Sequence, residues 1–600
     1  MRIDIVRGAA ADVLLDQETF LRQWSDLCRN CPWATPFQGP DFATIWYRAY
    51  RRNFEPLLVL SHGPDGRLQG LLPLAVAVVG ADRSGKDDLL VVAGAWQAEY
   101  QAWICPPQIG DGFAAAAVDT LHRAMPSAEL RFRYLPPGTP TTWLDRTAPG
   151  LAHRLRRHRR PLMRFGDGSE IAASLRKGSN KTRLRRLEKS GGVEFRQLTS
   201  AVELDPLFDE VIAYHDARHL AVHGTAAFQE DPCKRPFHLA MADVTGLLHV
   251  TVMTVGGRVA AAHLGASGGT EVQLGVIAHD PWLSKHSPGK FHIYFLARML
   301  REQGYEQLDL TAGGDPYKER FANAWDEVET LDLVPTSVAR RRDVIRLARG
   351  GIRWAARRAL APLPVTPADV RSWAHEMRHR GPRGIAAALT RGTLLGAGPS
   401  RETRVYRYDL DGTGHSLPGT AGTELVGRNR LPDLLTYRPA RSDPSRQRFL
   451  TTALRRIQEG QHVYTCTEDG RLLHVAWLVA PRTRTDGAAA PDVPRPPDSA
   501  LVHDFYTAPE AVGRGLDDAT LRVVLRDAAR LCGAGSVAAA VPAGDEPARR
   551  AVEKSGFVYA RSVAPVPPRR PDPARGDERR TPDIPAPRIS SAKEKGPQRG

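Results

Sequence analysis

The segment from Ser287 to Lys290 has the residue types of an anion-binding helix start. It reads Ser-Pro-Gly-Lys and leads into an amphipathic stretch that predicts a helix up to Gln303. Pro288 presets the backbone angle of a first helical residue, Gly289 lets a ligand approach the main chain, and Lys290 adds a positive charge. Because N–H groups at a helix start bind phosphate, the segment is a candidate phosphate site. The alternative interpretation is an ordinary helix start.

A second candidate group follows the predicted strand EQLDLTA, in the loop 311–318. Gly313 and Gly314 permit a sharp turn in this loop. Tyr317 and Lys318 then stand at or near the start of the next predicted helix. Side chains at this place point back toward the strand ends, where open α/β-type sheets bind their ligands. The alternative is that the tyrosine packs in the core and the lysine is solvated.

Three histidines and one aspartate are further candidates. His263 lies on a predicted central strand and could act as a base near neutral pH, or it could be a core histidine. His215 and His219 are four residues apart and face one side of a helix, which suits a metal ion or the lining of an acceptor groove. No third ligand is evident, so we expect no metal. Asp309 could orient Lys318 or face solvent.

Strands and turns around these residues repeat along the chain. In the second segment LLHVTVMTV and RVAAAHLGA flank Gly256-Gly257, a hairpin turn, and EVQLGVIA, a helix and EQLDLTA follow. The third segment repeats this order and the first does so more loosely. We therefore predict the α+β fold class, as three domains with mixed, mostly antiparallel sheets and flanking helices. The predicted boundaries are 1–165, 166–335, an arginine-rich linker 336–399, 400–562 and a disordered tail 563–600.

Composition limits the function classes. The 600 residues are 42% hydrophobic and 25% charged, which is typical of a globular chain and excludes a multi-span membrane protein. Six cysteines and the lack of a secretory signal indicate a reducing, cytoplasmic compartment. The net charge of +16 favours acidic partners. Residues 340–391 are rich in arginine and could rest on the anionic inner face of a membrane.

Two further basic runs flank the junction of the first two predicted domains. They are either solvated faces or a surface for an anionic substrate. The first run contains Arg154, Arg156, Arg157, Arg159 and Arg160, and the second contains Lys177, Lys181, Arg183, Arg185, Arg186 and Lys189.

The order of meander, glycine turn, helix and strand resembles the GNAT acyltransferase superfamily. The strings SLRKGSNKTRLRRLEKSGGVEF, Ser287-Pro288-Gly289 and EQLDLTAGGDPYKERF resemble the CelD/BcsL acetyltransferases of cellulose and exopolysaccharide synthesis, which are related to FemAB transferases. This resemblance covers about residues 1–335. It implies acetyl-CoA or another acyl-CoA as co-substrate, Tyr317 as an acid or thioester contact, and Lys318 as an anchor for phosphate or acceptor.

The third segment resembles a degenerate GNAT domain. Where that superfamily has its pyrophosphate loop, the chain reads Val512-Gly513-Arg514-Gly515-Leu516-Asp517, and only Gly515 fits the pattern. An aspartate would stand near the phosphates. An accessory or dimerising role for this segment is therefore as consistent with the sequence as activity.

The sequence thus predicts a cytoplasmic acyltransferase that moves an acyl group from acyl-CoA to an amine or hydroxyl of a sugar or cell-envelope precursor. The expected acceptor is a small molecule or glycan precursor, and nucleic acid is not expected. Two alternatives stay open: a FemAB-like transferase that uses aminoacyl-tRNA, and a non-catalytic scaffold of a polysaccharide-synthesis complex.

Overall fold

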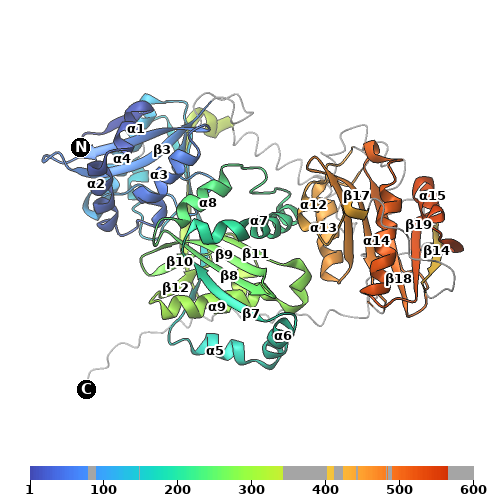
Figure 1. Cartoon of the computed structure of the whole chain (residues 1–600). Helices are drawn as coiled ribbons and strands as arrows, with labels where there is room; N and C mark the ends of the chain where they lie inside the picture. The colour runs from blue at the N-terminus through green and yellow to red at the C-terminus, as the bar shows by residue number, and fades with distance from the viewer. Residues whose placement is uncertain are drawn as a thin grey trace, which may run out of the picture.

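The computed structural model describes residues 1–78, 90–146, 149–341, 402–410, 423–440, 443–481, 483 and 490–564 (Figure 1). Most of the predicted linker 336–399, including nearly all of 340–391, and most of the tail 563–600 lie outside these residues. The described residues form three sheets with helices on their faces, two of the sheets mixed and one antiparallel. The predicted fold class is confirmed.

The first sheet is a four-stranded antiparallel meander near the N-terminus, in the order β1-β2-β3-β4. Aromatic residues of α2 and α3, among them Trp24 and Trp46, are fully buried in the core of this domain. The elements are β1 (Asp4–Arg7), α1 (Ala9–Leu15), α2 (Glu18–Arg29), α3 (Pro40–Ala49), β2 (Phe54–His62), β3 (Leu68–Ala77), β4 (Leu90–Val92) and α4 (Gly110–Ala124).

The second sheet has nine strands in the order β5-β13-β6-β12-β10-β9-β8-β7, and β11 pairs with β9 beside this path. All neighbours are antiparallel except β10 and β12. The strands are β5 (Leu130–Leu135), β6 (Leu151–Arg164), β7 (Val193–Leu198), β8 (Leu248–Val255), β9 (Arg258–Gly268), β10 (Glu271–Gln273), β11 (Val276–His279), β12 (Gln307–Asp309) and β13 (Ala324–Pro335).

Helices cover both faces of this sheet. The even-numbered positions of β8, such as Val250 and Val252, share a core with α7, whereas Met253 on the other face shares a core with α9. The predicted turn at Gly256-Gly257 joins β8 to β9, and both glycines have positive φ angles of 60° and 76°. The helical segments are α5 (Ser169–Arg176), α6 (Gly178–Lys189), α7 (Ala201–His223), α8 (Lys234–Ala242), the 3₁₀ turn η4 (Pro281–His286), α9 (Pro288–Glu302) and the 3₁₀ turn η5 (Lys318–Arg320).

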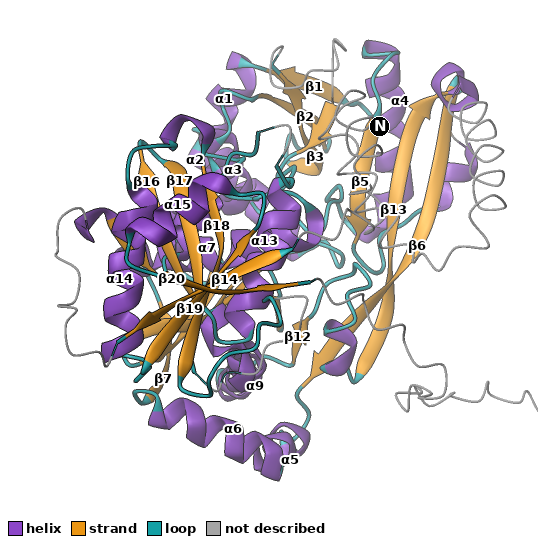
Figure 2. Ribbon diagram, turned by 90° about the vertical axis from the view of Figure 1, so that its right-hand side faces the viewer, coloured by secondary structure: helices purple, strands orange, loops and turns teal. Residues whose placement is uncertain are grey.

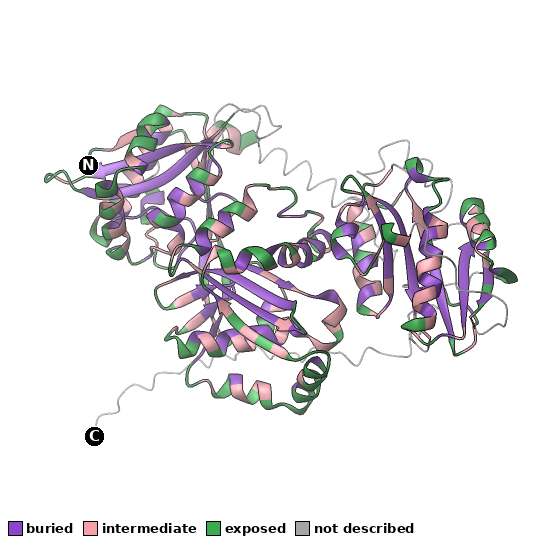
Figure 3. Cartoon of the chain, viewed as in Figure 1, coloured by how far each residue is buried: buried purple, intermediate pink, exposed green. Residues whose placement is uncertain are grey.

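The third sheet has seven strands in the order β15-β16-β17-β18-β19-β14-β20, with β18 and β19 parallel. Figure 3 shows that the strands of this sheet and of the second sheet are mostly buried, while the outer helices are exposed on one side. The elements are β14 (Thr403–Asp409), β15 (Val426–Arg428), α12 (Leu431–Leu435), α13 (Arg446–Gln458), β16 (His462–Glu468), β17 (Arg471–Val479), β18 (Ser499–Thr507), α14 (Leu516–Arg530), β19 (Ser536–Pro542), α15 (Glu546–Lys554) and β20 (Val558–Val563).

The first segment does not complete the predicted repeat. Its last strand, the ELRFRYL segment of β5, leaves the four-stranded sheet and pairs with β13 at the edge of the nine-stranded sheet. β13 pairs along its whole length with the long strand β6 (Figure 2). Pairing with β13 therefore ties the first domain to the second and decides where β5 lies.

Three arginines of the first basic run form ion pairs within the same ladder. Arg156 lies 2.6 Å from Asp332, Arg157 lies 3.2 Å from Glu329, and Arg160 contacts Asp326. Acidic residues of β13 thus face arginines of β6, and opposite charges across neighbouring strands stabilise a sheet. Three of the five arginines of the run are therefore held by carboxylates of the neighbouring strand. None of the described helices is long and apolar enough to cross a membrane.

Candidate functional site

The second sheet opens at a break in one strand. β10 and β11 follow each other along β9, but only β10 pairs with β12. The N–H of Leu274 donates to the carbonyl of Asp309 at 2.8 Å, and beyond it none of the described strands pairs with β11 on that side. A Cβ on Gly275 would lie 2.5 Å from the carbonyl oxygen of Leu264. Glycine therefore permits the close approach of the segment between β10 and β11 to β9. The break leaves an edge of β11 facing a gap.

A cavity of about 560 Å³ lies at this gap. Its walls come from β9, β11, the first turn of α9 and the segment around η5. The predicted residues in its lining are Ser287, Pro288, Gly289, Lys290, His263 and Tyr317. The structure therefore brings together the helix start, the strand histidine and the loop tyrosine, which the sequence places up to 54 residues apart.

Cations dominate the charge of this cavity, and none of its described lining residues is an aspartate or glutamate. The positively charged residues come from α6, α7, α9 and η5 and from the N-cap of α6. They are Lys177, Arg183, Arg218, Lys290 and Arg320. A set of ammonium and guanidinium donors without a competing carboxylate suits a phosphorylated ligand.

The first turn of α9 adds a backbone donor to this set, the N–H of Gly289. Ser287 precedes the helix with a left-handed φ of 57°, and no side chain caps the helix start. The Arg183 guanidinium donates to Ser287 Oγ at 3.2 Å, and Lys290 Nζ donates to Asn180 Oδ1 at 3.0 Å. Burial and the neighbouring Arg183 lower the pKa of Lys290. Pro288 has no N–H, and the N–H of Lys290 donates to the carbonyl of Ser287 at 3.1 Å. The N–H of Gly289 is therefore the first-turn donor that, beside several cations, fits a phosphate of an acyl-CoA.

His263 forms part of the cavity wall from the buried face of β9. Its side chain is fully buried, and its Nε2 lies 3.2 Å from the carbonyl oxygen of Gln273. Burial, together with the nearby His249, lowers the pKa of His263 well below its ordinary value. The imidazole is therefore neutral at neutral pH. Its role as a base stays a prediction.

Tyr317 lies at the other side of the cavity. The guanidinium of Arg218 is 5.8 Å from the centre of its ring, and the ring packs against the core cluster that contains Leu296 and Leu310. Burial raises the pKa of Tyr317, and Asp315 adds to the effect. The hydroxyl thus keeps its proton at neutral pH, as a proton donor must. Its catalytic role stays a prediction.

Lys318 does not occupy the expected place. Its Nζ is buried and donates to Thr311 Oγ1 at 2.8 Å and to the Thr311 carbonyl at 3.2 Å, outside the cavity lining. The ammonium closes the loop 311–318 on itself and is not free to anchor a phosphate. Gly313 and Gly314 form the predicted sharp turn, with φ angles of 145° and 73°, and they do not line the cavity either.

Asp309 has neither of the two expected roles. It is fully buried, and its carboxylate contacts Tyr100 and Arg160 instead of Lys318 or solvent. His215 and His219 stack at 5.5 Å on α7, and His215 lies 3.1 Å from Asp216. No cluster of metal-binding side chains is found in the described part of the chain.

The sequence reasoning missed His279, Arg218 and Arg320, which line the same cavity. His279 ends β11, and burial and the nearby Arg218 lower its pKa to about 4. Its position beside the Asp-Pro pair that ends the strand was the available signal. Glu99 of the first domain was also missed: it lies 3.2 Å from Arg133, and its charge acts on the pKa of Tyr317.

The matching region of the third domain has a different charge. Asp517 and Asp518 stand in the first turn of α14, where the second domain has Gly289 and Lys290. Arg514 of the Gly-Arg-Gly turn forms two hydrogen bonds with Glu468, at 2.8 and 2.9 Å. These carboxylates would oppose a phosphate.

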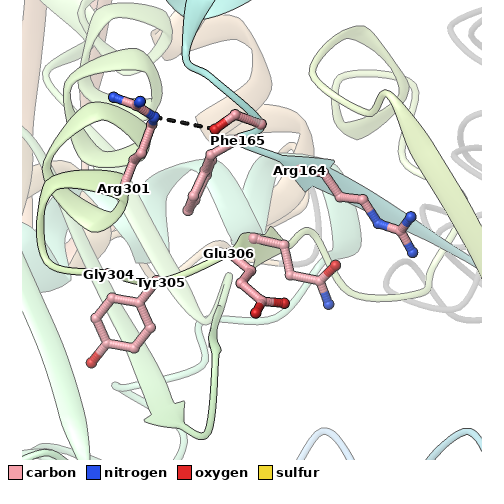
Figure 4. A pocket seen from close by; sticks show the side chains of 8 residues that line it. Arg164, Phe165, Arg301, Gly304, Tyr305 and Glu306 are labelled. Carbon is pink, nitrogen blue, oxygen red and sulfur yellow. Dashed lines mark hydrogen bonds between the residues drawn. The ribbon is translucent and has the colours of Figure 1, made fainter.

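A larger open cavity of about 910 Å³ lies at the other end of α9 (Figure 4). Arg301 donates to the carbonyl of Gly166 at 3.2 Å there, and Arg164 lies on the opposite wall. It contains none of the predicted site residues. The predicted site residues that line a cavity are therefore found in the smaller one.

Residues 174–319 match the family model for the acetyltransferase (GNAT) domain, Acetyltransf_6. This stretch contains every predicted site residue. Comparison with curated proteins gives no match.

Solved structures resemble the chain only distantly. FemX is 10% identical over 52% of this chain and 95% of its own, with a TM-score of 0.37. L-PGS from Bacillus licheniformis is 11% identical over 52% and 90%, with a TM-score of 0.32. A tandem GNAT protein from the clavulanic acid biosynthesis pathway is 15% identical over 62% and 96%, with a TM-score of 0.20.

Proposed function

We propose that the protein transfers an acyl group from acyl-CoA to an amine or hydroxyl of a sugar or cell-envelope precursor. One observation carries the proposal: a single cavity joins the first turn of α9 and five cations to the unpaired edge of β11. The match of residues 174–319 to a GNAT domain supports it. The polysaccharide precursor as acceptor rests on the sequence resemblance to the CelD/BcsL group.

Different residues of the cavity would bind the cofactor, stabilise the oxyanion and transfer protons. Arg183, Lys290 and the first turn of α9 would hold the phosphates of the cofactor. Bound acyl-CoA supplies a thioester carbonyl. N–H groups on the free edge of β11 can donate to an oxygen that gains negative charge, which stabilises it. Tyr317 holds a proton for a leaving thiolate, and a neutral imidazole of His279 or His263 can take one from the acceptor.

The basic surface of α6 favours a second candidate function. The residues Lys181, Arg185, Arg186 and Lys189 are exposed on α6, next to the Arg183 that enters the cavity. A polyanionic donor such as an aminoacyl-tRNA would use this basic surface. Contact with an anionic membrane through 340–391 also stays a proposal.

Titration calorimetry of the full chain with CoA tests the first function. We expect binding that Arg183→Gln weakens, together with thiol release from acetyl-CoA when sugar amines or alcohols are supplied. If the chain binds no CoA but binds tRNA with a steep dependence on salt, the second function replaces the first.

A further inference from the structure

The third domain packs directly on the domain that carries the cavity. One continuous apolar core contains Phe208 of α7, Leu450 and Ile457 of α13, and Trp477 of the third sheet. Thr451 Oγ1 also donates to the carbonyl of Ala221 near the end of α7, at 3.2 Å. Figure 1 shows α12 and α13 between α7 and the third sheet. The two domains therefore share a core instead of being joined only by the chain between them.

The end of α13 reaches the segment that precedes the phosphate-binding turn. Trp282 of η4 packs against the shared core, and Lys285 Nζ donates to the carbonyl of Glu459 at 3.1 Å. Glu459 is the C-cap of α13. Carbonyls at a helix C-terminus carry partial negative charge, so a lysine placed there is attracted to them. The third domain thus holds η4 from outside.

Ser287, the residue that follows η4, has an unfavourable backbone conformation that its surroundings must stabilise. Ser287 has a left-handed φ of 57°, which is unfavourable for an L-residue, and it sets the direction in which α9 begins. Arg183 of α6 bonds to its hydroxyl on one side. Lys285, two residues earlier, is bonded to α13 on the other side. The turn is therefore fixed by contacts from two different domains.

The third domain itself is poorly suited to an anionic cofactor. The first turn of its α14 contains Asp517 and Asp518, and Asp517 accepts a hydrogen bond from Thr507 at 3.2 Å. The only cation of the preceding turn, Arg514, is paired with Glu468. The third domain thus holds the site in place, whereas the second domain provides the residues suited to an anionic cofactor.

We propose that the third domain is a positioning module for the cavity of the second domain, that Lys285 is its positioning residue, and that this domain binds no acyl-CoA of its own. The statement about acyl-CoA rests on the proposed function. The statement about Lys285 does not, because it concerns the order of the turn in the free protein.

Substitutions of Lys285 in the full chain test the positioning role. Its side chain is exposed, so the fold should tolerate them. Lys285→Arg keeps the donor, Lys285→Met removes it, and Lys285→Glu sets a carboxylate against the end of α13. We expect amide exchange over 281–291, measured without ligand, to rise about threefold in Lys285→Met and more in Lys285→Glu, while Lys285→Arg stays at the wild-type rate. Unchanged exchange in Lys285→Glu would overturn the positioning role.

Binding of CoA provides the second measurement, with Lys181→Glu as the control for a lost charge. Lys181 is an exposed cation of α6 that does not line the cavity. We expect the affinity for CoA to fall about tenfold in Lys285→Glu and markedly less in Lys181→Glu, with one CoA bound per chain. If both variants lost the same affinity for CoA, Lys285 would act only as a distant charge and the positioning role would be overturned. Two CoA molecules bound per chain would overturn the statement that the third domain binds none. If the wild type bound no CoA, the proposed function would fail while the exchange result still decided the role of Lys285.

Discussion

The hydroxyl of Tyr100 donates a hydrogen bond of 2.5 Å to Asp309, and the two fully buried residues connect the first domain to the strand that leads into the site. Arg160 lies 3.3 Å from the same carboxylate oxygen. The other oxygen of Asp309 accepts from the N–H of Thr311 at 2.7 Å, at the beginning of the loop that carries Tyr317. The first domain therefore fixes the wall of the cavity from behind.

Asp309 makes stability depend on pH. Burial raises its pKa to about 7, although Arg160 opposes this shift. Between about pH 4 and 7 the folded protein keeps a proton that the unfolded chain has lost, so this contribution to stability falls as pH rises. We expect the unfolding free energy of the wild type to fall relative to Asp309→Asn by up to about 1.4 kcal/mol per pH unit in this window. Denaturant unfolding at several pH values measures it, and a constant difference would contradict it.

Replacing Tyr317 with phenylalanine should separate catalysis from binding. The substitution removes the hydroxyl but keeps the ring that packs beside Arg218. If the hydroxyl supplies the proton, the turnover number should fall about 100-fold while the affinity for CoA changes less than about twofold. Steady-state rates of thiol release and calorimetry measure the two quantities. An equal loss of affinity would show that the tyrosine acts only in binding.

The cations of the cavity should account for the affinity for phosphorylated ligands. Arg183→Gln and Lys290→Gln each remove one donor beside the first turn of α9. Each should weaken CoA binding by about tenfold, because a hydrogen bond to a charged group contributes about 1.5–3 kcal/mol and these two side chains are partly solvated. Raising the salt concentration should reduce these differences.

The matched control is Arg164→Gln, which removes a cation from the larger cavity at the other end of α9. It changes the net charge of the chain by the same amount. We expect CoA affinity within about twofold of the wild type, since charges beyond ~10 Å are largely screened at ordinary salt. A loss as large as that in Arg183→Gln would mean that the binding site had been assigned to the wrong cavity.

Local patterns in the sequence predicted much of this site. The hairpin at Gly256-Gly257 and the helix that starts at Pro288 follow from turn chemistry and apolar periodicity, which depend on neighbouring residues only. Tyr317 was placed at the cavity by the strand that precedes it. These features needed no knowledge of distant parts of the chain.

The errors concern residues whose surroundings come from far away in the sequence. Period-two alternation shows which face of β5 is buried but not which sheet it joins, and β13, almost 200 residues later, decides that. Arg160 appeared solvated because its partner Asp326 lies 166 residues away. Asp309 was expected either to orient Lys318 or to face solvent, and both expectations failed for the same reason, since its partner Tyr100 belongs to the first domain.

The pH profile of the reaction, together with a substitution of His279, tests whether this imidazole accepts the proton. Burial, with Arg218 nearby, lowers the pKa of His279 to about 4, so this group is unprotonated throughout the range above that value. If His279 is the base, kcat/KM with a hydroxyl acceptor should show no loss between about pH 8 and 5.5, whereas a histidine with the ordinary pKa of about 6.5 would produce one. His279→Gln should lower kcat about 100-fold across this range. A loss of activity centred near pH 6.5 in the wild type, or full activity in His279→Gln, would leave the role to another group.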